Sequence, residues 1–240
     1  MKRTIVASCK TPGIGLGNRM TILCSAYAAA AVRGDDCVLY WPTGRGCEAH
    51  WSDLFKPMEL VEIVSREPIN AKVHNVPSYV PSKVSRMLRT AELKRFTTEY
   101  WAAWRKCAQS IELIDELALP DHPERFTAVS IRSNWAPRAP KNDWMHKLQL
   151  PQGSFICTDS PEAHRQAMAV CENGWSLSVP QTKHDMGARD VRSMQAAARD
   201  MMMLTRASCI LAIGDRSTFR NLAHIGYHVP VFKHYRNRNP

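Results

Sequence analysis

The sequence predicts an α/β protein made of two similar halves, and three observations support this fold class. Short β-branched segments alternate with apolar-faced helical segments along the 240 residues. The alternation starts at the N-terminus and starts again after residue 125, and residues 119–125 (LPDHPER) have the composition of a linker. Strand, helix and strand follow at the spacing of units with a parallel sheet. We expect two Rossmann-like halves, residues 1–120 and 121–240, with a cleft between them.

The first half is predicted to open with a strand, a helix and a second strand. A β-branched segment ended by prolines or glycines predicts a strand, and a stretch rich in Ala, Leu and Met predicts a helix. Prolines interrupt the middle of the chain, and Pro120 ends its helical stretch. The expected elements are strands over 3–8, 36–42 and 61–65, a helix over 17–32, a loop over 68–81 and a helical stretch over 85–119.

The second half repeats this alternation. Pro161 is expected to open a helix at its first turn with Ser160 as N-cap, and residues 189–206 show apolar residues at helical spacing. The other expected elements are strands over 126–133, 153–160, 175–180, 208–214 and 229–232 and a helix over 217–225.

Composition favours a globular protein with a packed core, because 45% of the residues are hydrophobic and 22% are charged. None of the eight cysteines forms a CxxC pair and most lie in apolar runs, so we expect buried, reduced thiols of a cytosolic protein. The apolar stretch over 22–32 is shorter than the ~20 residues that span a bilayer, and the basic N-terminus has too short an apolar core for a signal peptide. We expect a cytoplasmic protein without a membrane span.

The formal net charge of +10 suits an anionic partner such as a nucleotide, an acidic or phosphorylated glycan, DNA or a membrane surface. The basic residues are spread along the chain, so a general solubility charge is the alternative.

Polar clusters follow several predicted strands, where open α/β sheets bind ligands. The first, GIGLGNR over residues 13–19, offers backbone N–H groups at a helix N-terminus, which favours an anion. Its glycines do not fit G-x-G-x-x-G and no G-K-[ST] follows, so a P-loop is excluded. A plain turn would also explain the glycines, but Asn18 and Arg19 at the helix start would not be needed for a turn.

Three more clusters end strands of the second half. Arg132 could pair with phosphate oxygens, or it could bridge a surface carboxylate. Asp159 could accept hydrogen bonds from a base or ribose, but helix capping is an alternative explanation for both Asp159 and Ser160 beside it. Residues 214–219 place hydroxyls and N–H groups at a helix start, which suits a phosphate or an ordinary N-cap.

These segments together resemble the nodulation-type α-1,6-fucosyltransferases and the protein O-fucosyltransferases, which share the two-domain GT-B fold. The resemblance rests on GLGNRM, VLYWP and GCEAHWSDLF in residues 1–60, and on ICTDSPE, DMMMLTRASCILAIG and RSTFRNLAHIG in residues 125–230. It implies transfer of fucose from GDP-fucose to a glycan hydroxyl by an inverting, metal-independent displacement. The donor is then a substrate, and no cofactor is required.

The resemblance also implies roles for individual residues. Asn18 and Arg19 would lie close to the sugar and the reaction centre, and Arg132 would hold the β-phosphate and stabilise the leaving GDP. These three are the expected catalytic residues, and the N-terminal half is the acceptor side. The expected donor-binding residues are Gly15, Gly17, Asp159, Ser217, Thr218 and Phe219.

The arginine motif departs from the family pattern H-x-R-R-x-D, because this chain has SIRSNW with Ser130 and Ser133 at the histidine and second arginine positions. Another GDP-sugar is therefore an alternative donor. No D-x-D metal motif occurs anywhere in the chain, which fits catalysis by Arg132 and helix N-termini. The general base stays open among Asp53, Asp143 and Glu48.

Two other functions remain alternatives. Modified DNA is one alternative acceptor, since residues 83–106 are basic with Trp101 and Trp104 interleaved. A solvated basic helix would explain this segment equally well. A non-catalytic nucleotide- or glycan-binding module is the other alternative, because the arginine motif is incomplete.

Overall fold

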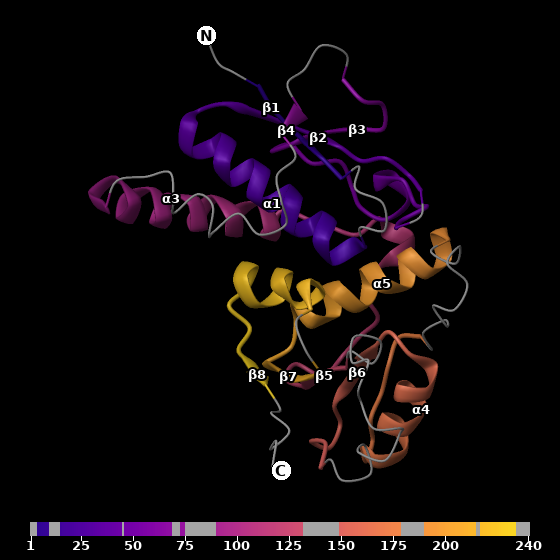
Figure 1. Ribbon diagram of the computed structural model, residues 1–240. Coiled ribbons are helices and arrows are strands. Elements are labelled where there is room, and N and C mark those ends of the chain that lie inside the picture. The colour runs from indigo at the N-terminus through magenta and orange to yellow at the C-terminus, as the bar shows by residue number, and fades with distance from the viewer. Residues whose placement is uncertain are drawn as a thin grey trace, which may run out of the picture.

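Two four-stranded parallel sheets, one in each half of the chain, form the framework of the protein (Figure 1). This computed structural model describes residues 4–9, 15–44, 46–68, 73–74, 90–131, 149–178, 190–214 and 217–233, with the backbone alone over 73–74 and 90–96. The first sheet has the order β3-β2-β1-β4, with β1 (Thr4–Ser8), β2 (Asp36–Tyr40), β3 (Glu62–Val64) and β4 (Val73–His74). The second has the order β6-β5-β7-β8, with β5 (Thr127–Ile131), β6 (Phe155–Thr158), β7 (Cys209–Ile213) and β8 (Val231–Lys233). The predicted α/β fold of two Rossmann-like halves is confirmed.

Helices from both halves lie between the two sheets (Figure 1). The α-helices are α1 (Leu16–Arg33), α3 (Thr90–Gln109), α4 (Pro161–Val170) and α5 (Val191–Leu204). The shorter helices are η1 (Trp51–Asp53), η2 (Asp115–Leu117), η4 (Thr218–Arg220) and η5 (Leu222–Gly226). Helices α1 and α3 cover one face of the first sheet, and α5, η4 and η5 cover the facing side of the second, whereas α4 lies on its far side.

Helix α1 ends as its sequence indicates. Gly34 adopts a left-handed conformation with φ of 71°, and its backbone N–H caps the carbonyls of Ala30 and Ala31. The alanine-rich face of α1 then packs against α3, where Trp104 Nε1 donates to Ser25 Oγ over 3.3 Å.

One hydrophobic core runs across both halves. It contains the inner face of the first sheet, α1 and α3, and it continues into the second half through four buried residues of α5 and one of η5: Met194, Ala198, Met201, Met202 and Leu222. Hydrogen bonds join the halves as well, since Gln109 Nε2 donates to the Gly226 carbonyl over 2.9 Å and the Tyr227 hydroxyl donates to the Ala108 carbonyl over 3.4 Å. The division into an acceptor-side half and a donor-side half at residue 120 stays a prediction.

Several elements differ from the sequence-based expectation. Residues 175–178 form no strand; Trp175 makes a single bridge to Phe155, and its ring packs on Phe126 and Phe155 instead. Strand β4 falls in the expected loop over 68–81 and adds the fourth strand beside β1. Residues 218–226 form a 3₁₀ turn and a π turn rather than an α-helix, because they fold closely onto α1 and α3.

The cysteine prediction is confirmed in structural terms. All eight cysteines lie in described residues and are free thiols, seven of them buried and Cys209 half-buried. Over the described part of the chain, none of the helices combines the length and the apolar character that a membrane span would require.

Candidate active site

The start of α1 and the start of η4 meet in direct backbone contact. Helix α1 follows β1, and η4 follows β7, so both segments lie beyond the carboxyl ends of parallel strands. A Cβ atom built on Gly17 would lie 2.6 Å from the Phe219 nitrogen and 2.9 Å from the Thr218 carbonyl carbon. Only glycine fits at this position. The structure thus brings together three predicted donor-binding residues from opposite ends of the sequence.

The N-terminus of α1 is open toward an anion. Gly15 occupies the N-cap without a capping side chain, and the first turn holds no acidic residue. The backbone N–H groups of Asn18 and Arg19 both point to the Gly15 carbonyl at 3.1 Å. Leu16 and Gly17 have N–H groups that donate to no described residue, so the positive end of the helix keeps two donors for a ligand.

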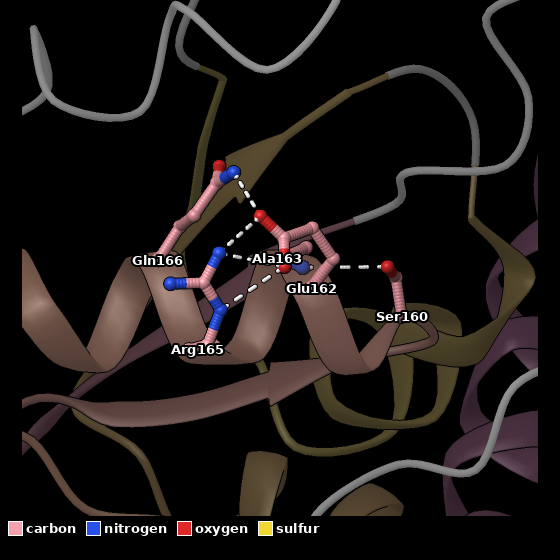
Figure 2. A network of polar contacts seen from close by, with 5 residues as sticks. All are labelled: Ser160, Glu162, Ala163, Arg165 and Gln166. Atoms are coloured by element: carbon pink, nitrogen blue, oxygen red, sulfur yellow. Dashed lines mark hydrogen bonds and ion pairs between the residues drawn. The ribbon is translucent and has the colours of Figure 1, made fainter.

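Helix α4 begins just as close to a strand end, but its N-terminus is already satisfied (Figure 2). The Ser160 hydroxyl accepts a hydrogen bond from the Ala163 N–H at 3.3 Å, as predicted for an N-cap. Glu162 places a carboxylate in the first turn, where Arg165 and Gln166 bind it and the hydrogen bond from Arg165 helps to lower its pKa. An anionic ligand would be repelled here, so α1 offers the better phosphate site.

The hydroxyls of Ser217 and Thr218 are available at the start of η4. Ser217 precedes this short helix in an extended conformation and makes no side-chain cap hydrogen bond. It is buried and Thr218 is half-buried, beside the open end of α1. Two hydroxyls and two amides that bond no described residue therefore lie near the contact between α1 and η4, and such a donor set suits a diphosphate.

The two N-terminal candidates, Asn18 and Arg19, have different surroundings. Asn18 is half-buried, and its amide group makes no hydrogen bond to any described side chain or backbone group, so it can bind a ligand. Arg19 is only 3% exposed and donates from Nη1 to the Pro42 carbonyl over 2.8 Å. The catalytic role of both residues stays a prediction.

The second half adds Asp200, a residue that the sequence analysis missed. This carboxyl belongs to α5 and accepts a hydrogen bond from the thiol of Cys157, near the carboxyl end of β6. Its Oδ1 is shielded from solvent and has no hydrogen-bond partner among the described residues. Burial raises the pKa of Asp200 to about 7, against the opposing effects of Arg199 and of the Cys157 hydrogen bond. Asp159, the predicted nucleoside contact, lies half-buried just after the same strand.

The remaining predicted residues are the phosphate-binding arginine, the general-base candidates and a tryptophan of the basic segment. Arg132 and Asp143 lie outside the described residues. Glu48 is exposed, and Asp53 caps η1, because its Oδ2 accepts from the His50 N–H at 2.7 Å. Trp104 is buried, so it offers no stacking surface to a nucleic acid.

A cavity of about 550 Å³ lies on the first sheet, lined by residues of β1, β2 and β3 and by residues 66–68, which follow β3. Its floor consists of Val6, Val38 and Val64, and Glu62 and Arg66 line its rim. It shares no residue with the site described above, so we do not assign a donor to it. Within the described ranges, no three His, Cys, Asp or Glu side chains converge as metal ligands would, and metal-independent transfer stays a prediction.

Comparison with solved structures defines the class of this fold. The fucosyltransferase NodZ from Bradyrhizobium aligns over 100% of this chain and 97% of its own, with a TM-score of 0.59 and 18% identity. NodZ α-1,6-fucosyltransferase soaked with GDP-fucose aligns over 97% and 95%, with a TM-score of 0.58 and 18% identity. Arabidopsis thaliana FUT1, as the R284K mutant in complex with GDP, aligns over 100% and 71%, with a TM-score of 0.57 and 11% identity.

The protein therefore has a fucosyltransferase-like fold. No protein-family model matches the chain, and no curated protein matches it in sequence. Of these structures, one NodZ crystal was soaked with GDP-fucose and the Arabidopsis FUT1 mutant is a complex with GDP.

Proposed function

We propose that this protein is a glycosyltransferase that moves a sugar, fucose from GDP-fucose in the simplest case, to a glycan hydroxyl. The contact of Gly17 with Thr218 and Phe219 carries the proposal. It joins two segments from the two ends of the sequence to which the resemblance gives related roles, a sugar-facing loop and a diphosphate-binding segment. The fucosyltransferase-like fold and the open donors at this point support the same conclusion.

In this proposal the diphosphate binds where α1 meets η4. The amides of Leu16 and Gly17 and the hydroxyls of Ser217 and Thr218 donate to its oxygens, and Arg132 supplies the positive charge. Cleavage of the sugar–phosphate bond places negative charge on the β-phosphate while the anomeric carbon becomes oxocarbenium-like. Donors fixed in advance around that charge lower the barrier to departure. Asn18 would orient the sugar from the acceptor side.

Asp200 supports guanine as the base of the donor. The Watson–Crick edge of guanine carries adjacent N–H donors at N1 and N2, and an ionised carboxylate is a pure acceptor that can meet both. Asp200 would provide such a group once ionised. Its carboxyl lies beside the carboxyl end of β6, with an Oδ1 that is shielded from solvent and bonds no described residue. Because burial raises its pKa to about 7, guanine binding would require this carboxyl to lose its proton and to become accessible. Cytosine, uracil and adenine lack this pair of adjacent ring and exocyclic donors at one edge. We therefore propose selectivity for GDP over UDP, ADP and CMP.

The experiment is a metal-free calorimetric titration with GDP, UDP, ADP and CMP. Arg132→Ala tests the phosphate contact, and Arg125→Ala is its matched control, because Arg125 is exposed just before the amino end of the same strand. We expect selective GDP binding that weakens at least about tenfold in Arg132→Ala and stays unchanged in Arg125→Ala. Selective UDP binding would refute the fucosyl assignment, and absence of any nucleotide binding would refute the transferase.

A second measurement separates the enzyme from a binding module. GDP-fucose is incubated with the protein without acceptor, and release of GDP is followed. Slow hydrolysis of the donor supports the transferase. GDP binding without any hydrolysis, and without transfer to a panel of glycans, would favour the non-catalytic module.

A further inference from the structure

Arg19 is a buried cation near the N-terminus of α1, where the positive end of the helix dipole makes a positive charge unfavourable. It belongs to the first turns of α1, where the helix dipole is positive and no acidic residue of the first turn compensates it. Only 3% of the residue is exposed. Burial of a charge without compensating contacts is strongly unfavourable, so its partners must offset this cost.

Two partners come from the segment that follows β2. The Nη1 group donates to the Pro42 carbonyl over 2.8 Å, and Cζ lies 4.8 Å from the centroid of the Trp41 ring. An Arg guanidinium can make both contacts at once because it is planar and weakly hydrated. The charge also reaches the segment after β1, where it opposes the effect of burial that raises the pKa of the Cys9 thiol to about 12.

Trp41 connects Arg19 to the segment over residues 42–55, because it contacts two residues of that segment. Its Nε1 donates to the Ala49 carbonyl over 3.0 Å, and its ring meets Trp51 edge-on at 5.3 Å. From there, Gln195 Nε2 of α5 donates to the Asp53 carbonyl over 3.2 Å. The described residues of this segment, 42–44 and 46–55, are therefore held between the start of α1 and the second half of the protein.

We propose that Arg19 is a positioning residue that clamps residues 42–55 against the start of α1 and does not touch the donor. Its Nη1 group already donates to the Pro42 carbonyl, and its guanidinium lies against the Trp41 ring, so these contacts hold it at residues 41–42. The clamp follows from these contacts alone, whereas its effect on sugar transfer rests on the proposed function. Held in this way, residues 42–55 would form a fixed wall on the acceptor side of the site, beside Asn18.

The test compares Arg19→Lys with Arg33→Lys by amide hydrogen exchange. Lys keeps the charge but cannot both stack on Trp41 and bond Pro42 as a guanidinium does. Arg33 is the matched control, because it is exposed at the other end of the same helix. We expect exchange of the amides in residues 42–55 to be at least about tenfold faster in Arg19→Lys, with β5 and β7 unchanged, and no change in Arg33→Lys.

Two functional measurements separate positioning from direct contact. The proposal predicts a GDP dissociation constant within about twofold of wild type in Arg19→Lys, since no donor contact is lost. It predicts that kcat for GDP release from GDP-fucose falls about tenfold or more while KM for GDP-fucose stays nearly constant. A general loss of folded protein would instead be seen in β5 and β7.

Unchanged exchange over residues 42–55 would overturn the clamp, and so would a tenfold loss of GDP affinity in Arg19→Lys. If Arg19→Lys does not fold, Trp41→Phe takes its place, because it removes the bond to Ala49 but keeps an aromatic ring. Faster exchange over residues 42–55 in that variant supports the clamp, and unchanged exchange overturns it. If the wild type binds no nucleotide, the proposed function fails, but the exchange data still decide the clamp.

Discussion

Substitution of Gly17 by alanine tests the contact on which the proposed site depends. The added Cβ would lie 2.6 Å from the Phe219 nitrogen and 2.7 Å from its Cα, whereas an ordinary contact begins near 3.4 Å. The backbone of η4 would have to move by about 0.8 Å, since no flexible side chain can yield in its place. Such overpacking costs roughly 1–3 kcal/mol, and alanine returns about 1 kcal/mol of helix propensity. We expect a loss of unfolding free energy between about 0 and 2 kcal/mol.

The effect on donor binding should be larger than the effect on stability. A shift of this size misaligns the amides of α1 with the hydroxyls of η4, and loss of one charge-assisted hydrogen bond weakens binding by about tenfold or more. Calorimetry with GDP and a thermal unfolding curve measure the two effects separately. Wild-type GDP affinity in Gly17→Ala would refute the assignment of the site to this contact.

Gly226→Ala is the matched control for Gly17→Ala. Its Cβ would meet the Ala108 Cβ at 2.7 Å, so it overpacks the same boundary between the halves at a point outside the predicted donor residues. We expect a comparable loss of stability with GDP affinity within about twofold of wild type. An equal loss of GDP affinity in both variants would mean that the loss comes from weaker packing between the two halves. Gly17 would then have no specific role in the donor site.

Three further predictions follow from individual side chains. Burial holds the pKa of Asp200 at about 7, above its unfolded value of 3.8, so the unfolding free energy should fall as the pH rises from about 4 to 7. GDP affinity should rise over the upper part of that range, as the carboxyl ionises. Asp200→Asn should flatten both profiles, which pH-dependent melting and calorimetry measure. Asp53→Asn should keep kcat for GDP release within about threefold, because an amide oxygen can still accept from the His50 N–H, whereas loss of a general base would lower kcat by about 10²–10⁴. Ser160→Ala should lower the unfolding free energy by about 1 kcal/mol, because Ala163 loses its cap, and a changed GDP affinity would contradict the assignment of the phosphate to α1.

Local sequence patterns predicted the elements whose stability is mainly local or periodic. Helix α1, with its glycine stop, and α4, with Ser160 and Pro161 at its start, form close to the expected residues. The apolar spacing in residues 189–206 predicted α5 in the same way. Most of the short β-branched strands were also found, because they alternate with these helices, although residues 175–178 form only a single bridge and β4 was not predicted.

Features that depend on packing between the halves could not be found in this way. Residues 217–225 have a helical pattern, but the chain tightens into 3₁₀ and π turns where Gly226 and Phe219 press on the first half. Asp200 was not singled out in the helix predicted over residues 189–206. A signal was present, however, because the run of methionines after it leaves α5 with little exposed surface and so draws this carboxyl inward.

The core shared between the halves means that neither half is complete without the other. If residues 121–240 were expressed alone, Met194, Ala198 and Met201 would lose the residues that bury them. The fragment would then expose an apolar surface prone to aggregation. If residues 1–120 were expressed alone, Trp104 and Ala108 would likewise be exposed to solvent. The chain should therefore melt in one step, and a large rotation of the halves would break the core itself.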